Sequence, residues 1–291
     1  MDLLSIDSLT DEQIGSILDH AEKHYAAKFA APLSLTGKLV FNLFYENSTR
    51  TLMSFATAAH RLGASVVTMP VEQSSVKKGE SLQDTAATLN AMQPDLLVIR
   101  HRDNGAPAAV AEILDAPVIN AGDGTNEHPT QALLDAATIR HRLGQVEGLK
   151  IAICGDIKHS RVARSNTKLL SRLGAEVRLA GPPELMPEGI ERRSVDEAIE
   201  GADVVMMLRV QRERLESDLG DAPGEFLRRY GLTADRLAHA GSDAVVMHPG
   251  PMNRGVEIDG AIADDPERSL ITTQVAMGVA VRMACLELLL A

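Results

Sequence analysis

The chain has 291 residues, of which 45% are hydrophobic, 24% are charged and only 3% are aromatic, with no tryptophan. These values are typical of a globular protein with room for two domains of ordinary size, whose core must consist mainly of Ala, Val, Leu, Ile and Met. The net charge of −11 argues against a nucleic-acid-binding surface, so any site for anions must be made by clustered Arg and Lys residues set against the overall sign.

The N-terminal residues lack the basic segment and the long apolar run of a signal peptide. The most apolar stretch, residues 275–290, is interrupted by Arg282 and Glu287 and falls short of the ~20 residues needed to span a bilayer. Cys154 and Cys285 lie too far apart in sequence to form a CxxC pair or a zinc knuckle. We therefore expect a cytoplasmic protein with no membrane segment.

The first predicted element is a helix that begins with a capping box at Thr10 and Gln13, followed by apolar residues at helical spacing. His20 and His24 are four residues apart on this helix. We expect no carboxylate partner beside them on this exposed helix, so the two histidines should occupy a solvated face rather than a metal site.

Eight short apolar runs then predict strands in two series of four. Helix-like segments lie between most of them, and several end at a glycine, as a left-handed C-cap prefers. Such alternation predicts an α/β fold with two doubly wound parallel-sheet domains covered by helices on both faces. The helix expected at residues 129–143 would bridge the two series, and the apolar helix at about 269–290 is expected to be buried. The predicted strands are residues 39–45, 64–69, 95–99, 117–120, 150–154, 176–180, 203–208 and 244–247.

The segment Ser48-Thr49-Arg50-Thr51 stands between the first predicted strand and a helix-like run. The first turn of a helix has unpaired N–H groups and a positive dipole end, which together bind phosphate, and an Arg adds a bidentate clamp. Read alone, the same four residues are equally compatible with a simple Ser/Thr N-cap followed by a solvated Arg.

Polar and cationic side chains follow several of the other strands, where ligands bind in open parallel sheets. Because four Arg, one His and one Gln share this topological position, the sequence predicts an anion-binding catalytic cleft. No GxGxxG spacing, P-loop, GxSxG turn or HExxH motif is present, so we expect chemistry without a cofactor or a metal. The six residues are Arg50, Arg100, His128, Gln131, Arg161 and Arg209.

Four motifs resemble the signatures of aspartate carbamoyltransferase catalytic chains, a branch of the transcarbamoylase family. The resemblance runs from about residue 39 to the C-terminus, with the motifs in the same order and at matching spacing. Ornithine transcarbamoylases typically carry HPCQ in place of the second motif and lack the third, which favours the aspartate branch. The motifs are Ser48-Thr49-Arg50-Thr51, His128-Pro129-Thr130-Gln131, Arg209-Val210-Gln211-Arg212-Glu213-Arg214 and His248-Pro249-Gly250-Pro251-Met252-Asn253-Arg254.

The resemblance implies two domains of the transcarbamoylase type joined by two helices. Residues 1–142 and 272–291 would form a carbamoyl-phosphate-binding domain, and residues 143–271 an aspartate-binding domain. The implied reaction transfers the carbamoyl group of carbamoyl phosphate to the amino group of L-aspartate, an early step of de novo pyrimidine biosynthesis. The chain departs from many relatives at Leu52 and Ala56, where a charged pair is usual; this puts local packing in doubt, not the chemistry.

The resemblance also implies roles for individual residues. Thr51, Arg100 and His128 would surround the carbamoyl oxygen, although His128 could instead only hold the entry to the next helix. The carbonyls of Pro249 and Gly250 would join Gln131 in accepting the carbamoyl NH₂, although Pro249-Gly250-Pro251 taken alone is more often a rigid turn. Glu46 and Arg214 would orient the arginines that bind aspartate. The carbamoyl phosphate site would comprise Ser48, Thr49, Arg50, Thr51, Arg100, His128, Gln131, Gly250 and Pro251, and the aspartate site Lys78, Arg161, Arg209 and Gln211.

A long polar loop at residues 71–80 contains Ser75 and Lys78. In the family this loop reaches a neighbouring active site, which implies a homotrimer with shared sites; without the family, Lys77 and Lys78 would be read as a solvated pair. Regulatory or dihydroorotase-like partner chains are possible partners. Three other functions remain open: a transcarbamoylase with another amine acceptor, a non-catalytic anion-binding subunit and a nicotinamide-dependent enzyme. Another acceptor is disfavoured by the two cations Arg161 and Arg209, which suit a dicarboxylate. A non-catalytic subunit would be expected to have lost Arg50, Arg100 or His128, and a nicotinamide-dependent enzyme is disfavoured because the dinucleotide fingerprint is missing.

Overall fold

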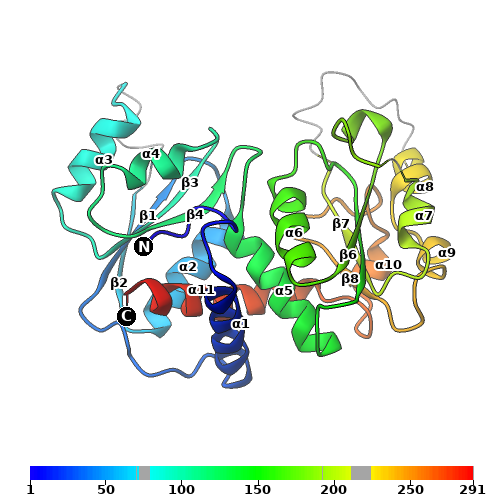
Figure 1. Cartoon of the computed structure of the whole chain (residues 1–291), viewed down its shortest axis with the longest axis horizontal. Helices are drawn as coiled ribbons and strands as arrows, with labels where there is room; N and C mark the ends of the chain where they lie inside the picture. The colour runs from blue at the N-terminus through cyan, green and yellow to red at the C-terminus, as the bar shows by residue number, and fades with distance from the viewer. Residues whose placement is uncertain (70, 72–78, 192, 211–223, 291) are drawn as a thin grey trace. The chain divides into compact units, whose positions relative to one another are not determined.

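The computed structural model describes residues 1–69, 71, 79–191, 193–210 and 224–290. The chain forms two compact units (Figure 1): Met1–Ala137 with Val275–Ala291, and Thr138–Gln274. Each unit is built on a four-stranded sheet in which all pairs are parallel, with strand orders β2-β1-β3-β4 and β6-β5-β7-β8. The predicted α/β fold with two helix-flanked parallel sheets is thereby confirmed.

In unit 1, helices cover both faces of the sheet (Figure 1). Alternate residues of the central strands, such as Phe41 and Leu43, pack against buried side chains of α3 and α4, and α2 contacts β1 and β2. The elements are α1 (Asp11–Ala26), β1 (Leu39–Phe44), α2 (Thr49–Arg61), β2 (Ser65–Met69), α3 (Leu82–Asn90), β3 (Leu96–His101), α4 (Ala106–Ala111), β4 (Val118–Asp123) and α5 (Pro129–Leu143).

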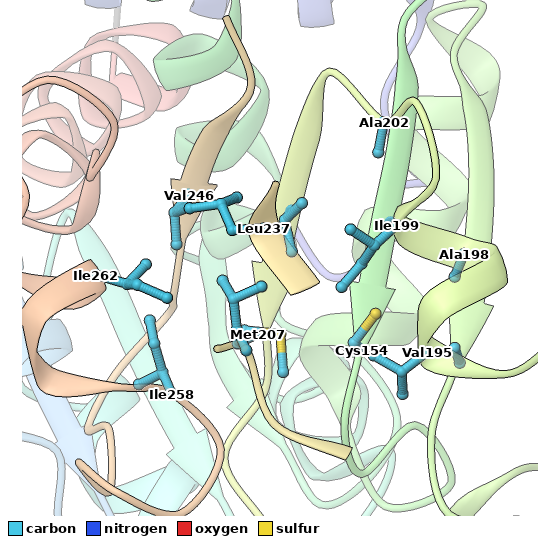
Figure 2. Close-up of a cluster of buried hydrophobic side chains, with 14 of the residues drawn as sticks. Cys154, Val195, Ala198, Ile199, Ala202, Met207, Leu237, Val246, Ile258 and Ile262 are labelled. Carbon is cyan, nitrogen blue, oxygen red and sulfur yellow. The ribbon is translucent and has the colours of Figure 1, made fainter. Parts of the chain in front are cut away.

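In unit 2, the core lies between the sheet and the short helices that follow β6, β7 and β8. Figure 2 shows Cys154 and Met207 of the sheet among Ile199, Leu237, Ile258 and Ile262. Complete burial raises the pKa of the Cys154 thiol to about 12, so this cysteine acts as a small apolar side chain. The elements are β5 (Lys150–Cys154), α6 (Arg161–Arg172), β6 (Glu176–Ala180), η3 (Pro183–Leu185), α7 (Val195–Ile199), β7 (Val204–Met207), α8 (Glu225–Tyr230), α9 (Ala234–Leu237), β8 (Val245–Met247) and α10 (Gly260–Ala263). Two helices belong to both units: α5 begins in unit 1 and ends in unit 2, and α11 (Ile271–Leu290) begins in unit 2 and lies mostly in unit 1.

Helix α1 begins with the predicted capping box, but the expectation for His24 is wrong. His24 is only 8% exposed, and its Nε2 atom lies 2.8 Å from Oε2 of Glu287. Ser34 donates a hydrogen bond to the other oxygen of the same carboxyl group. The carboxyl partner comes from α11, far away in the sequence, and this contact ties the first helix to the last.

Helix α11 is long and apolar enough to be a candidate membrane span by length and composition alone, but more than half of its most apolar window is buried within the protein. Its central cation, Arg282, is 3% exposed and lies 5.0 Å from the centroid of the Phe55 ring. Burial lowers the pKa of this guanidinium to about 10. An apolar helix of this kind is accounted for by burial in a protein core.

Candidate active site

Seven of the predicted residues lie at one edge of the first sheet. Strands β1, β3 and β4 are consecutive neighbours in that sheet, and all run in the same direction. Their carboxyl ends therefore lie side by side, and the segments that leave them carry the predicted side chains. These are Ser48, Thr49, Arg50 and Thr51 after β1, Arg100 next to the last residue of β3, and His128 and Gln131 after β4.

The segment after β1 has the form of an anion-binding helix start. Helix α2 begins at Thr49, and Ser48 occupies the N-cap position without a side-chain hydrogen bond to the helix. The first helical bond runs from the Leu52 N–H to the Ser48 carbonyl at 3.1 Å. Within the described part of the chain, the N–H groups of Thr49, Arg50 and Thr51 meet no acceptor. The Ser48 side chain therefore does not cap the helix, although Arg50 is exposed as the alternative interpretation expected, and three N–H donors and a hydroxyl are left for a ligand.

Arg100 is held by the strand and by a carboxyl group. The Tyr45 N–H donates to the Arg100 carbonyl at 2.8 Å, and the Nε atom of Arg100 lies 3.1 Å from Oε2 of Glu46. Both side chains are less than one fifth exposed, at 15% for Arg100 and 19% for Glu46. Glu46 thus contacts an arginine other than the two that the resemblance assigned to it.

Asp123 organises the loop that leads from β4 to α5. This carboxyl group is 1% exposed and accepts hydrogen bonds from Asn120, Asn126 and the backbone N–H groups of Gly105 and Glu127, at 2.7 to 3.1 Å. Four donors on one buried carboxyl group fix the loop that ends at His128. Nothing in the local sequence distinguishes Asp123 from a surface carboxyl group, because its partners come together only once β4 and α4 are packed.

His128 and Gln131 lie at the start of α5 and are buried, at 3% and 8% exposed. The His128 carbonyl accepts from the N–H groups of Gln131 and Ala132 at 2.9 and 3.3 Å, so the backbone of His128 begins the helix. The Gln131 NH₂ group donates to Oδ1 of Asp135 at 3.0 Å, one helical turn later. This contact directs the amide nitrogen toward Asp135 and leaves the amide oxygen as the acceptor on the opposite side.

The same topology recurs in the second sheet. The carboxyl ends of β5, β7 and β8 are neighbours, and they are followed by Arg161, Arg209 and the segment His248–Pro251. Arg161 is the first residue of α6, whose N-cap Ser160 accepts a hydrogen bond from the Ala163 N–H at 3.1 Å. Arg161 is 8% exposed, which is unusual for an arginine and indicates a position built for a specific charge.

Gly155 permits the close approach of β5 and β7 next to Arg209. Its φ of +131° lies in a region that side chains rarely adopt, and a Cβ atom there would stand 2.5 Å from the Leu208 carbonyl oxygen. Leu208 immediately precedes Arg209, and its N–H donates to the Cys154 carbonyl at 2.7 Å. Gly155 therefore sets the position of the backbone that carries Arg209.

Lys78, Ser75, Gln211 and Arg214 lie outside the described residues, so their roles stay predictions. Gly250 and Pro251 are in unit 2, whereas the other residues predicted for carbamoyl phosphate are in unit 1. Among the described residues, no group of three or more His, Cys, Asp or Glu side chains could hold a metal ion.

The sequence matches two domain models of one protein family. A model described as the aspartate/ornithine carbamoyltransferase carbamoyl-P binding domain matches residues 1–141, and one described as the Asp/Orn binding domain matches residues 147–289. The chain belongs to the aspartate/ornithine carbamoyltransferase family. The two carbamoyltransferase domain models together span nearly the whole chain.

Individual relatives point to the aspartate branch of the carbamoyltransferases. The aspartate carbamoyltransferase catalytic subunit of Rhizorhabdus wittichii is 57% identical over 296 residues, covering 99% of this chain and 94% of the relative. The corresponding subunit of Granulibacter bethesdensis is 56% identical over 296 residues, with the same coverage. The resemblance to aspartate carbamoyltransferase catalytic chains is thereby confirmed.

Solved carbamoyltransferase structures are also similar. The aspartate transcarbamoylase of Trypanosoma cruzi in complex with N-(phosphonacetyl)-L-aspartic acid has a TM-score of 0.87 at 34% identity, covering 100% of this chain and 95% of that one. Its complex with carbamoyl aspartate and phosphate has a TM-score of 0.86 at 33% identity, covering 100% and 96%.

Proposed function

We propose that this chain catalyses transfer of the carbamoyl group of carbamoyl phosphate to the amino group of L-aspartate, giving N-carbamoyl-L-aspartate and phosphate. The observation that carries the proposal is its 56–57% identity, over 99% of its length, to aspartate carbamoyltransferase catalytic subunits. The related Trypanosoma cruzi enzyme has been crystallised with carbamoyl phosphate and aspartate together, and with carbamoyl aspartate and phosphate. The reaction is an early step of de novo pyrimidine biosynthesis.

The start of α2 binds the phosphate group in this proposal. Ser48, Thr49, Arg50 and Thr51 supply hydroxyls, free N–H donors and a guanidinium fork, and the helix dipole adds positive charge at the same end. The three N–H groups without acceptors in the described chain support this role, because unpaired donors are already directed outward before the ligand arrives.

Thr51, Arg100 and His128 stabilise the carbamoyl oxygen. As the aspartate amine attacks the carbamoyl carbon, that oxygen gains negative charge, and preorganised donors lower the barrier most where charge develops. Glu46 keeps Arg100 in place and the Asp123 loop keeps His128 in place, so neither group must reorganise during the reaction.

The carbamoyl NH₂ group needs acceptors rather than donors. Gln131 offers its amide oxygen, since its nitrogen is engaged by Asp135, and the carbonyls of Pro249 and Gly250 complete the set. Pro251 lacks an N–H, so no backbone donor competes at that point.

Arg161, Arg209, Gln211 and Lys78 bind the carboxylates of aspartate. Two arginines suit a dicarboxylate, because each fork can pair bidentately with one carboxylate group, which Lys could not match. An acceptor with a cationic side chain, such as ornithine, would meet like charge instead.

Proximity and charge stabilisation carry most of the rate, since no side chain among the residues that the structure describes is placed as a strong general base. The amine nitrogen forms a bond to the carbamoyl carbon, the carbon–oxygen bond to phosphate breaks, and the departing phosphate accepts the proton lost by the amine. No cofactor or metal takes part in this scheme.

The proposal extends to the domains and the assembly. Residues 1–142 with 272–291 form the carbamoyl-phosphate-binding domain, and residues 143–271 form the aspartate-binding domain. The enzyme is a cytoplasmic homotrimer in which Ser75 and Lys78 reach a neighbouring site, with regulatory or dihydroorotase-like chains as further candidate partners and no nucleic-acid or membrane partner.

The test is a kinetic assay of the purified protein with each candidate acceptor. We expect carbamoyl aspartate to form at a saturable rate, and ornithine to be a poor acceptor. Arg209→Ala should raise the aspartate KM by roughly tenfold or more while carbamoyl phosphate binding stays nearly intact. Arg172→Ala, which removes an exposed arginine of the same unit, is the control. Preference of the wild type for ornithine would refute the proposed substrate.

A further inference from the structure

A polar cluster is buried behind the segment that follows β8. His248 is 2% exposed, Glu257 0% and Gln274 3%. The His248 N–H donates to Oε1 of Gln274 at 2.9 Å, which fixes the backbone at the point where the strand ends. None of these three side chains has a part in the reaction described so far, and most buried polar groups in proteins are hydrogen-bonded.

The hydrogen bonds of His248 determine which ring nitrogen carries its proton. The Gly250 N–H donates to Nδ1 of His248 at 2.8 Å, so Nδ1 is an acceptor and has no hydrogen. The ring proton is therefore on Nε2, which lies 3.2 Å from Oε1 of Glu257. His248 thus donates to Glu257 through one nitrogen and accepts from Gly250 through the other.

Glu257 holds the segment at two points. Its Oε1 atom accepts from the His248 ring and also from the Asn253 N–H. Its Oε2 atom is buried and has no hydrogen-bond partner in the described structure, so the whole polar function of the side chain rests on one oxygen. Glu257 itself is anchored, because its carbonyl accepts from the Leu232 N–H and the next residue, Ile258, lies in the core cluster shown in Figure 2.

Because the peptide group is planar, the direction of the Gly250 N–H also determines the direction of the Pro249 carbonyl. The Pro249–Gly250 peptide bond is trans, and in a trans peptide the N–H and C=O groups point in opposite directions. Because the Gly250 N–H points at the His248 ring, the Pro249 carbonyl must point away from the buried cluster. The direction of this carbonyl therefore depends on the His248 ring being an acceptor at Nδ1.

We propose that Glu257 is a positioning residue: by holding the proton of His248 on Nε2, it directs the Pro249 carbonyl to accept the carbamoyl NH₂ group of the substrate. This inference rests on the proposed function, which supplies the ligand for that carbonyl. It assigns a catalytic consequence to a side chain that touches no substrate.

Two substitutions at Glu257 separate positioning from packing. Glu257→Met keeps the length of the side chain but removes the acceptor, so kcat should fall by roughly tenfold to a hundredfold, while the aspartate KM stays within about twofold. Glu257→Gln keeps an acceptor oxygen in place of Oε1 and puts its NH₂ where Oε2 has no partner. This variant should lose thermal stability but retain most of kcat.

The matched control is a second His–Glu pair, His24 with Glu287, in which the same kinds of atoms lie 2.8 Å apart. Glu287→Met should lower the melting temperature without changing kcat per folded molecule. Equal kcat in wild type and Glu257→Met would overturn the inference, as would equal losses of kcat in the Met and Gln variants at Glu257.

The ring of His248 provides a readout that does not depend on activity. In protein labelled with ¹⁵N-histidine, the His248 signals, assigned from a His248→Gln variant, should show a proton on Nε2 and a bare Nδ1 at neutral pH. A proton on Nδ1 would overturn the inference even if the Met variant fails to fold. If the wild type makes no carbamoyl aspartate while the ring shows the expected tautomer, the proposed function fails and the geometry at Glu257 does not.

Discussion

The guanidinium Nε atom of Arg100 lies 3.1 Å from Oε2 of Glu46, and both side chains are largely withdrawn from solvent. Glu46 stands just after β1 and Arg100 near the end of β3, so this pair joins two adjacent strand ends of the first sheet. Exposed ion pairs contribute ~0–1 kcal/mol, whereas loss of one partner from a buried pair costs more because a charge stays behind.

Glu46→Gln should therefore impair catalysis more than folding. We expect kcat/KM for carbamoyl phosphate to fall by roughly tenfold, because the negative charge that steadies Arg100 is removed. The control is Glu176→Gln, which neutralises a carboxyl group 2.8 Å from Arg178 but half exposed on the second sheet. Unchanged steady-state kinetics in Glu46→Gln would show that Arg100 needs no such support.

Arg50→Ala should abolish turnover while the fold persists. Loss of a charge-assisted contact to phosphate costs on the order of 2–4 kcal/mol, and more where water is excluded. Carbamoyl phosphate should then no longer raise the melting temperature of the protein. Arg61→Ala, at an exposed position in the last turn of the same helix, is the matched control and should keep both properties. Near-normal activity of Arg50→Ala would remove the phosphate assignment.

Gly155→Ala should weaken aspartate binding through the backbone. The added methyl group would meet the Leu208 carbonyl at 2.5 Å, so the strand end that carries Arg209 must shift. Gly148→Ala tests the conformational effect alone, because Gly148 also has a positive φ, +75°, but nothing lies within 4 Å of its Cβ position. We expect both variants to lose stability and only Gly155→Ala to raise the aspartate KM. Equal aspartate KM values in the two variants would contradict this account of Gly155.

Shared active sites can be tested by mixing two inactive variants, Lys78→Ala and Arg50→Ala. If a site combines Lys78 of one chain with Arg50 of its neighbour, every mixed trimer contains one intact site. Reassembly of an equal mixture should then restore about a quarter of wild-type activity, since about three quarters of random trimers are mixed and one site in three is intact in each. No recovery in trimers shown to contain both variants would place both residues in a site made by one chain.

Stability should decrease as the pH falls below the ordinary pKa of histidine, in part because of His101. This ring is 8% exposed, accepts a hydrogen bond from the Asp103 N–H at 3.0 Å and contacts the edge of the Tyr45 ring. Desolvation lowers its pKa in the folded state, against the attraction of Asp103, Glu46 and Asp123 and with the repulsion of Arg102. The unfolded chain therefore takes up the proton first, and stability is lost as the pH falls from about 6.5 toward the lower native pKa.

The measurement is the melting temperature at pH 7.5 and 5.5, compared with that of His101→Asn, whose side-chain oxygen can still accept from Asp103. The drop between the two pH values should be smaller in the variant. The same drop in both proteins would show that His101 does not contribute.

Local patterns in the sequence predict the elements that dominate this fold. The apolar runs of β1 through β8, the capping box of α1 and the strand-end positions of Arg50, Arg100 and Arg209 follow from short-range periodicity and turn chemistry. The start of α2 is less well predicted: the helix-like apolar pattern begins at Leu52, directly after the segment Ser48–Thr51, whereas the helix begins at Thr49. Polar residues do not contribute to an apolar pattern, although they form the first turn.

Contacts between distant segments could not be predicted in this way. Nothing near His24 in the sequence indicates that Glu287 would bury it, and the roles of Asp123 and Glu257 depend on partners supplied by other elements. The supporting residues of the site are of this kind, since a carboxyl group that orients a neighbour is indistinguishable in sequence from one on the surface. Motifs therefore predict the residues proposed to touch the substrates better than those that hold them.

Unit 1 consists of two separate stretches of the chain, and this affects the order in which the two units can fold during synthesis. The segment Val275–Ala291 belongs to this unit, and Met277, Val281, Met283 and Cys285 are fully buried in it. Domains generally fold during synthesis in the order in which they leave the ribosome. Here the continuous second unit has all of its residues before the first unit does, so we expect it to finish folding earlier. Limited proteolysis of chains stalled after Gln274 should find Thr138–Gln274 protected and the earlier residues cleaved; the reverse pattern would contradict this order. A stop codon before Met277 should then prevent the first unit from folding, although it removes only the last few residues of the chain.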